Sequence, residues 1–461
     1  MEWIEQLVGI INNWLWNGLL IVVLCGTGIY FTLRLGFVQI RKFGEAARLV
    51  LGQVRKVETE RKEGEMTPFQ SLATAIAAQV GTGNLAGAAT ALVGGGPGAI
   101  FWMWVSAFFG MATIYAEATL AQEYRTVVDG EVTGGPTYYI RQAFKGRFGK
   151  VLAGLFSIFI ILALGFMGNM VQSNSIGAAF TDVLQSRGIR VPAVLVGVLL
   201  AVAAGFIFIG GTRRLAAVVE RIVPFMAGVY ICGSLLLILM NASQIPEAFR
   251  MIFVGAFDPQ AMAGGAAGIT VREAVRFGVA RGLFSNEAGM GSTPHAHARA
   301  NARNPHEQGL TAMISVFIDT FVVLNLTVLA ILTSGVLSSG KEGTALTQAA
   351  FVSGFGGFGD IFVAVCLLFF AFSTILGWHF FGAINASYLF GPKAVRIYSM
   401  LVLLFIVVGS SLKVELVWSL ADLFNGLMVI PNALALLALG NVVVRICRKY
   451  GQKKRPELSE R

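Results

Sequence analysis

Charged residues are scarce in this chain. Asp, Glu, Lys and Arg make up 13% of the 461 residues, whereas a soluble domain carries roughly 25% because its surface must face water. Hydrophobic residues reach 56%, and the mean hydropathy is +0.71. A disordered chain is excluded too, since such chains are rich in charge and poor in apolar residues. The composition therefore predicts an all-α protein that crosses a membrane many times.

Cysteine is scarce as well. The four cysteines lie far apart, in or beside apolar stretches, and no two form a C-x-x-C pair: Cys25, Cys232, Cys366 and Cys447. This pattern argues against a disulfide framework and against a zinc site. Glycine, in contrast, is abundant, with 55 residues, or about 12% where roughly 7% is usual. Such an excess is typical of membrane helices that pack closely or are broken.

Ten apolar stretches have the length of about 20 residues that spans a bilayer as a helix. They are 15–37, 71–95, 98–121, 151–178, 191–210, 217–240, 309–335, 360–388, 395–412 and 416–444. The stretch 263–300 contains several charges, so hydropathy alone would reject it. We nevertheless expect it to span, because only eleven crossings place the basic segments 39–66 and 445–461 on one side of the membrane. Lys and Arg favour cytoplasmic loops, which predicts a plasma-membrane protein with its amino terminus outside and its carboxyl terminus in the cytoplasm.

The net charge of +10 would suggest a nucleic-acid partner in a soluble protein. Here most Lys and Arg residues fall on segments expected inside the cell, so membrane orientation explains the excess. We therefore expect the lipid bilayer, and no nucleic acid, as a partner. The basic segment 39–66 is predicted to be a cytoplasmic loop or a short amphipathic helix on the inner surface.

Two of the predicted membrane helices carry glycine-rich interruptions. Unwound backbone inside a membrane is tolerated only where it lines a cavity within the protein. The first interruption, QVGTGNLAG, surrounds Asn84, and the second, GLFSNEAGMGSTP, surrounds Asn286 and Glu287. Close packing of small residues is the alternative for the first. It explains the second poorly, because a carboxylate at mid-membrane depth costs at least about 2.5 kcal/mol unless a cavity, a proton or a partner relieves it.

The two interruptions occupy equivalent positions in the chain. Without the first helix ten remain, and the broken helices are the first and the sixth of those ten. Two halves of five helices must lie in the membrane in opposite orientations, as in an inverted-repeat secondary transporter. We expect a single membrane domain over 1–461, composed of an extra amino-terminal helix at 15–37, a first repeat at 68–240, a second repeat at 263–444 and a basic cytoplasmic tail at 445–461.

Several motifs resemble one family. GGPGAIFWMWVSAFFG at Gly95–Gly110, preceded by QVGTGNLAGAA and followed by GGPTYYI and GLFSNEAGMGSTPHAHA, closely resembles the alanine or glycine:cation symporters, also called sodium:alanine symporters. The resemblance extends from about Thr67 to the tail. It implies the leucine-transporter-type fold of ten core helices in two inverted halves, here with one extra helix. It also implies uptake of alanine or glycine with Na⁺, and sometimes with H⁺.

The resemblance implies a substrate site at the first interruption. The carbonyl and side chain of Gln79 would face the substrate ammonium, and the amides near Gly81, Thr82 and Gly83 would hold its carboxylate. Asn84 would brace the break. No charged residue lies in this segment, which favours a small neutral substrate.

Other candidate substrate residues lie on three further helices. Asn169 and Gln172 are three positions apart, share one face of a helix and are expected to touch the substrate. Phe284 and Ser285, at the second interruption, would cap the pocket. Trp378 is expected either to form a wall of the pocket or to pack in the core.

The resemblance also implies a sodium site. Carbonyls just before the first break pair with two hydroxyls on the eighth core helix, and here these are the carbonyls of Ala77 and Val80 with the side chains of Ser373 and Thr374. Na⁺ is a hard cation that prefers oxygen ligands. Without the resemblance, both hydroxyls could simply bond to carbonyls one turn earlier in their own helix.

The remaining intramembrane polar residues are harder to assign. Glu117 and Asp319 are expected either to pair with Arg276 or Arg281 or to carry a proton. His379 is expected to pack between helices through a hydrogen bond.

We predict a monomeric symporter that imports alanine or glycine with Na⁺ by alternating access and has no catalytic residues. In one alternative the same fold uses a proton, carried by Glu287 or Asp319. In another it is an intramembrane enzyme that uses His379 or Glu287, although no nucleophile lies at a recognisable spacing from a base. A channel is the third, and the pair of broken helices argues for a gated site instead.

Overall fold

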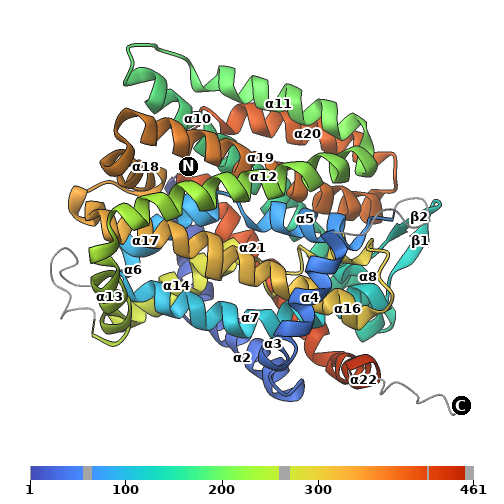
Figure 1. Cartoon of the computed structure of the whole chain (residues 1–461). Helices are drawn as coiled ribbons and strands as arrows, with labels where there is room; N and C mark the ends of the chain where they lie inside the picture. Colours follow the sequence, from blue (N-terminus) through green and yellow to red (C-terminus); the bar gives the residue numbers. More distant parts are fainter. Residues whose placement is uncertain (1, 55–64, 259–269, 413–414, 452–461) are drawn as a thin grey trace, which may run out of the picture.

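The protein is a bundle of helices with one short hairpin (Figure 1). The computed structural model describes residues 2–54, 65–258, 270–412 and 415–451. The hairpin consists of β1 (Thr126–Val128) and β2 (Glu131–Thr133), which pair antiparallel with Val127 opposite Val132. The predicted all-helical class is confirmed.

The amino-terminal part is one long helix followed by two short ones. The long helix comprises α1 (Glu2–Trp14), η1 (Leu15–Leu19) and α2 (Leu20–Arg34). The predicted basic segment 39–66 overlaps α3 (Val38–Arg41) and contains α4 (Phe43–Val54), which packs against α16 (Pro305–Val316). Residues 55–64 of that segment lie outside the described residues.

The region predicted as the first repeat begins at a capping box, in which Thr67 and Gln70 exchange hydrogen bonds and Pro68 between them is the first helical residue. Its helices are α5 (Pro68–Gln79), η2 (Gly83–Gly87), α6 (Ala88–Gly95), α7 (Gly98–Glu123), α8 (Pro136–Ala143), α9 (Gly146–Ile160), η3 (Ile161–Gly168), α10 (Asn169–Gln185), α11 (Ala193–Ile209) and α12 (Gly211–Met240). The connection that follows contains η4 (Ala242–Gln244) and α13 (Ile245–Phe257).

The region predicted as the second repeat begins at a similar capping box, formed by Thr270 and Glu273. Its helices are α14 (Val271–Asn286), α15 (Pro294–Ala298), α16, η6 (Phe317–Leu324), α17 (Asn325–Ser334), η7 (Val336–Ser339), α18 (Gly343–Phe355), η8 (Gly356–Phe358), α19 (Gly359–Phe390), α20 (Ala394–Gly409) and α21 (Glu415–Ala438). α22 (Gly440–Gly451) follows and is amphipathic, with Val443 and Ile446 buried and Arg445 and Arg448 exposed. Residues 452–461 of the predicted tail lie outside the described residues.

Among the described residues, seven helices are long and apolar enough to cross a membrane, and the bent pair α5 with η2–α6 makes an eighth. α11 and α20 are apolar but shorter. The α14–α15 segment is not among these spans, and α14 carries Arg272, Glu273, Arg276 and Arg281. The protein is therefore a polytopic membrane protein, and eleven crossings stay a prediction.

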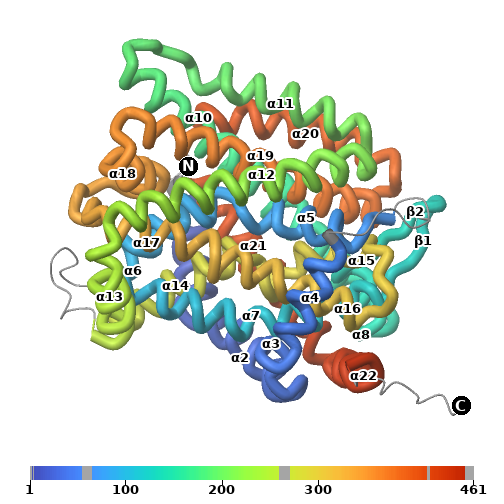
Figure 2. The backbone as a smooth tube through the Cα atoms, viewed as in Figure 1, coloured from blue at the N-terminus to red at the C-terminus, as the bar shows by residue number. Residues whose placement is uncertain are grey.

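The two broken helices run through the bundle in opposite directions. α6 packs against α14, and α5 packs against α15. Figure 2 shows the same relation, with α6 and α14 toward one side of the molecule and α5 and α15 toward the other. An inverted repeat requires this antiparallel arrangement, because its halves have opposite orientations. The two breaks are thereby brought next to each other.

Candidate transport site

The first break separates α5 from η2 and bends the helix by 48°. Beyond Gln79 the backbone leaves the helical conformation, and Val80 is extended. The amide of Gly81 donates to Asn84 Oδ1 at 3.0 Å, and the amide of Thr82 donates to Gln172 Oε1 at 3.2 Å. Side chains thus satisfy two of the backbone donors that a helix end exposes.

The second break lies between α14 and α15. Glu287 ends α14 in the left-handed conformation with φ +55°, and Gly289 and Gly291 follow with φ +90° and +82°. Glycine adopts such angles without steric cost, which explains Gly289 and Gly291 in this motif. Gln79 Nε2 donates to the carbonyl of Asn286 at 2.7 Å. One side chain at the first break therefore contacts the backbone at the second.

Carbonyls beside the first break meet a hydroxyl of α19. Thr374 Oγ1 lies 2.9 Å from the carbonyl oxygen of Ala77, 3.4 Å from that of Val80 and 3.0 Å from that of Phe370. A Cβ at Gly81 would collide with Thr374 Oγ1, so only glycine allows this approach. All these oxygens are uncharged, and all are buried. Such a set suits a hard monovalent cation.

Ser373 lies differently from Thr374. Its hydroxyl donates to the carbonyl of Phe370 at 2.9 Å and lies 3.5 Å from the sulfur of Met226 on α12. Of the two hydroxyls predicted at a sodium site, the structure brings Thr374 to Ala77 and Val80. Ser373 bonds within its own helix, as is common for hydroxyls in apolar helices.

Asp319 connects the two breaks. Its carboxylate is fully buried and accepts from Asn84 Nδ2 at 2.7 Å and from Ser285 Oγ at 2.9 and 3.0 Å. A third donor is Thr320 Oγ1, at 2.9 Å from Oδ2, and Thr320 also accepts from Asn286 Nδ2 at 3.2 Å. All these donors are neutral. Ser285, predicted to cap a substrate pocket, is therefore bound to Asp319.

The amides of α10 fall into two groups. Asn169 and Gln172 are buried, as their shared face predicts. Gln172 reaches the first break, whereas Asn169 Nδ2 donates back to the carbonyl of Gly165 at 2.9 Å. Asn169 Oδ1 has no partner among the described residues. Asn174 faces another helix and donates to the carbonyls of Gly409 and Leu412.

Two aromatic residues pack beside the second break. The rings of Phe284 and Trp378 meet edge to face, with centroids 6.0 Å apart. Trp378 Nε1 donates to Glu287 Oε1 at 2.5 Å. A Cβ at Gly83 would lie 3.1 Å from Cα of Ser285 and 3.4 Å from Cδ1 of Phe284. The predicted residues of the two breaks thus lie in direct proximity.

Glu117 on α7 braces the second break. Its carboxylate accepts from the amides of Gly289 and Gly291 at 3.0 and 2.9 Å and from Asn432 Nδ2 at 2.6 Å. Asn432 also donates to the carbonyl of Gly289 at 2.9 Å. A buried carboxylate thus binds the unwound backbone directly.

Of the two alternatives for Glu117 and Asp319, pairing with Arg276 or Arg281 is wrong, and carrying a proton stays a prediction. Arg281 instead pairs with Asp422 at 3.2 Å and stacks on Trp418. It lies at a partly exposed position, where water lowers the cost of the charge. Both intramembrane carboxylates are bound by amides and hydroxyls instead.

His379 packs between helices as expected. Its Nε2 lies 2.8 Å from Ser399 Oγ, and its ring stacks on Phe208 at a centroid distance of 3.5 Å. In the parts of the chain that the structure describes, no three His, Cys, Asp or Glu side chains form a group that could hold a metal ion.

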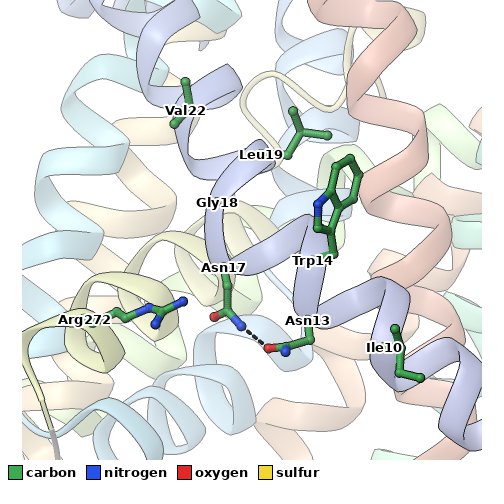
Figure 3. A pocket seen from close by; sticks show the side chains of 8 residues that line it. All are labelled: Ile10, Asn13, Trp14, Asn17, Gly18, Leu19, Val22 and Arg272. Carbon is green, nitrogen blue, oxygen red and sulfur yellow. Dashed lines mark hydrogen bonds between the residues drawn. The ribbon is translucent and has the colours of Figure 1, made fainter.

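A separate hollow of about 700 Å³ lies where the amino-terminal helix meets the start of α14 (Figure 3). Asn17 donates to Asn13 within it, and Arg272 lines it from α14. Its other lining residues are Ile10, Trp14, Gly18, Leu19 and Val22. None of the predicted site residues lines this hollow, so it is distinct from the buried region around the two breaks.

Sequence reasoning missed several residues at the breaks. Thr320, Asn432 and Ser292, which donates to Glu287 Oε2 at 2.5 Å, were not singled out. The signal for Asn432 was an amide within an apolar stretch, beside a proline. Ser292 and Thr320 carry no such signal, because hydroxyls are common in membrane helices.

Comparison with known proteins agrees with the resemblance seen in the sequence motifs. The family model described as "Sodium:alanine symporter family" matches residues 1–461. The sodium/alanine symporter AgcS of Methanococcus maripaludis is 41% identical over 458 residues, which cover 98% of each chain. The "Probable sodium/glutamine symporter GlnT" of Bacillus subtilis is 39% identical over 98% of this chain and 92% of its own. The amino-acid carrier protein AlsT of the same bacterium is 38% identical over 98% of this chain and 94% of its own.

The fold also has a solved counterpart. The structure of MhsT in complex with L-phenylalanine superposes with a TM-score of 0.57, over 86% of this chain and 91% of that chain. The sequences are 14% identical, so this likeness concerns the fold alone. It agrees with the leucine-transporter type expected from the motifs.

Proposed function

Because the chain belongs to the sodium:alanine symporter family, we propose that it imports a small neutral amino acid, alanine or glycine, together with Na⁺ by alternating access. It is a membrane transporter and not an enzyme, so the alternative of an intramembrane enzyme is wrong. The family name indicates sodium coupling, and the choice of ion in this chain is part of the proposal.

One observation carries the choice of Na⁺. Thr374 Oγ1 lies within 3.4 Å of the carbonyl oxygens of Ala77, Val80 and Phe370. In the proposed mechanism Na⁺ binds these oxygens, with Ser373 contributing only after its side chain turns from Phe370. Bound Na⁺ would link the first break, after α5, to α19. Na⁺ would therefore favour the conformation in which the break is shaped for the substrate.

The substrate is proposed to bind between the two breaks. Its ammonium would face the carbonyl and side chain of Gln79, and its carboxylate would accept from the amides at Gly81, Thr82 and Gly83. Gln172 Oε1 already accepts from the Thr82 amide and Asn84 Oδ1 from the Gly81 amide, so a substrate carboxylate would replace both acceptors there. The other proposed contacts are Asn169, Phe284, Ser285 and Trp378. The site is built largely of backbone, which supports a small substrate.

The proposed membrane arrangement follows from the sequence. The proposed eleven crossings are the extra helix 15–37 and two inverted repeats of five helices, at 68–240 and 263–444. The amino terminus would lie outside and the basic tail 445–461 in the cytoplasm. The transporting unit would be the monomer. The antiparallel packing of α5–α6 against α14–α15 supports the inverted repeat. Coupling then requires that Na⁺ and the amino acid each favour the state that the other binds, typically by about 1–3 kcal/mol.

A proton-coupled symporter of the same fold is the second candidate. It is favoured by the buried carboxylates of Asp319 and Glu287, whose hydrogen-bond donors are all neutral. Such a carboxylate lowers its cost in the membrane by taking up a proton or a cation.

Uptake into proteoliposomes tests the proposal and separates the two ions. Labelled alanine should accumulate when a Na⁺ gradient is imposed at equal pH on both sides. It should not accumulate when a pH gradient is imposed without Na⁺. Accumulation driven by the pH gradient alone would support the proton-coupled candidate, and uptake independent of any gradient would contradict both.

A further inference from the structure

The indole of Trp378 is held at a fixed position beside the second break. Trp378 is 2% exposed, and its Nε1 donates to Glu287 Oε1 at 2.5 Å. The other carboxylate oxygen, Oε2, accepts from Ser292 Oγ at 2.5 Å. Because both oxygens of Glu287 are bound, its carboxylate plane is fixed, and the indole is fixed with it.

The faces of the indole are confined as well. A Cβ at Gly168 would lie 2.5 Å from Cζ3 and 2.6 Å from Cε3 of Trp378, so the ring rests directly on the backbone where η3 meets α10. On another side the ring meets Phe284, which itself lies against Gly83 of the first break. Gly83, Phe284, Trp378 and Gly168 therefore form one continuous row between the first break and α10.

We propose that Glu287 and Gly168 are specificity-determining residues, which hold Trp378 as the wall that limits the size of the substrate side chain. This inference rests on the proposed function and deepens it. An indole that cannot rotate or retreat rejects a longer side chain by direct overlap. Glu287 acts through Trp378 and is a positioning residue, while the lack of a side chain at Gly168 lets the ring sit far enough back to leave room for a methyl group.

The competing explanation is that Glu287 only stabilises the second break. A purely structural role would lower the yield and the melting temperature of variants and leave the relative preference among substrates unchanged. A change in preference is the readout that separates the two roles, because it is a ratio measured within one variant.

The test uses the full chain in proteoliposomes, with uptake of labelled alanine under a Na⁺ gradient and unlabelled glycine, alanine and methionine as competitors. For Glu287→Ala, the ratio of the half-inhibitory concentrations of methionine and alanine should fall by roughly tenfold, since size discrimination in an apolar pocket is of that order. Glu287→Gln keeps an oxygen that can accept from the indole, and its ratio should stay near that of the wild type.

Two further variants make the test independent of folding at Glu287. Trp378→Phe removes the N–H donor but keeps a ring, so its methionine-to-alanine ratio should fall as in Glu287→Ala. Gly168→Ala should push the ring into the pocket, so that alanine inhibits less well relative to glycine, again by roughly tenfold. Unchanged ratios in Trp378→Phe and Gly168→Ala would overturn the inference.

A failure of the proposed function and a failure of this inference would give different results. A wild-type protein that accumulates no alanine under a Na⁺ gradient would contradict the proposed function, and this inference with it. A wild-type protein that accumulates alanine, with variants whose ratios do not change, would contradict this inference alone.

Discussion

Asn84 and Asp319 form one of the links through which the first break reaches the second. Asn84 Oδ1 accepts from the amide of Gly81, while Asn84 Nδ2 donates to Asp319 Oδ1 at 2.7 Å. Asp319 then accepts from Ser285, at the end of α14. A change in the conformation of one break therefore alters the hydrogen bonds of the other. This is the kind of contact that coupling between two sites requires.

Asp319→Asn is expected to weaken this link. An amide has one acceptor oxygen, so it cannot accept from Asn84, Ser285 and Thr320 together, and an unsatisfied buried donor costs about 1–3 kcal/mol. The melting temperature and the initial rate of alanine uptake should both fall. Glu247→Gln is the control, since its exposed pair with Arg250 should contribute little to stability. Equal effects of the two variants would contradict the role of Asp319.

Thr374→Ala and Ser373→Ala are expected to differ. Thr374 Oγ1 contacts the carbonyls of Ala77 and Val80, whereas Ser373 contacts Phe370 and Met226. Thr374→Ala should raise the Na⁺ concentration for half-maximal uptake at least about tenfold, as expected from the loss of about 1.4 kcal/mol of binding free energy. Thr374→Ser should restore most of the affinity. Full activity of the double variant with alanine at both positions would contradict the sodium site.

Gly81→Ala should impair Na⁺-driven uptake strongly. Its Cβ would collide with the Thr374 hydroxyl, and forcing extra atoms into a packed site typically costs about 1–3 kcal/mol. Gly87→Ala is the control in the same broken helix, because the nearest atom to its Cβ is the carbonyl oxygen of Thr82 at 3.9 Å. Uptake by both variants at several Na⁺ concentrations checks the prediction. A Gly87→Ala variant that is impaired as much would contradict a specific requirement for glycine at Gly81.

Glu117→Gln is expected to loosen the second break. Glutamine has one acceptor oxygen, whereas Glu117 accepts from two backbone amides and from Asn432. One buried donor would lose its partner, at a cost of about 1–3 kcal/mol. The melting temperature should fall, and hydrogen exchange of the amides at Gly289 and Gly291 should accelerate. Unchanged exchange at these two amides would contradict the bracing role.

The sequence predicted the class of protein and the positions of both breaks. Scarce charge and abundant apolar residues exclude water as the main solvent, whatever the tertiary structure. The glycines at Gly289 and Gly291 adopt positive φ angles that other residues avoid, so the local sequence marks the place where the helix must unwind. The resemblance to a known family then identified Thr374, Ala77 and Val80 as neighbours, although they are almost 300 positions apart.

The partners of the buried carboxylates could not be predicted in the same way. Charge suggested Arg276 or Arg281 as one of two alternatives for Asp319 and Glu117, the other being a proton. Their donors are instead amides and hydroxyls, most of them from other helices. Asn84 and Asp319 are 235 positions apart, and Glu117 and Asn432 are 315 apart. The local spacing of apolar and polar residues carries no information about such distant pairs.

The sequence by itself thus determined that this protein lies in a membrane and where two of its helices break, because solvent preference and backbone conformation are properties of short segments. Only the tertiary structure decided which side chains satisfy the opened backbone, that Thr374 rather than Ser373 faces the first break, and that Glu287 holds Trp378. Those contacts depend on how the helices pack against one another, and packing is a property of the whole bundle.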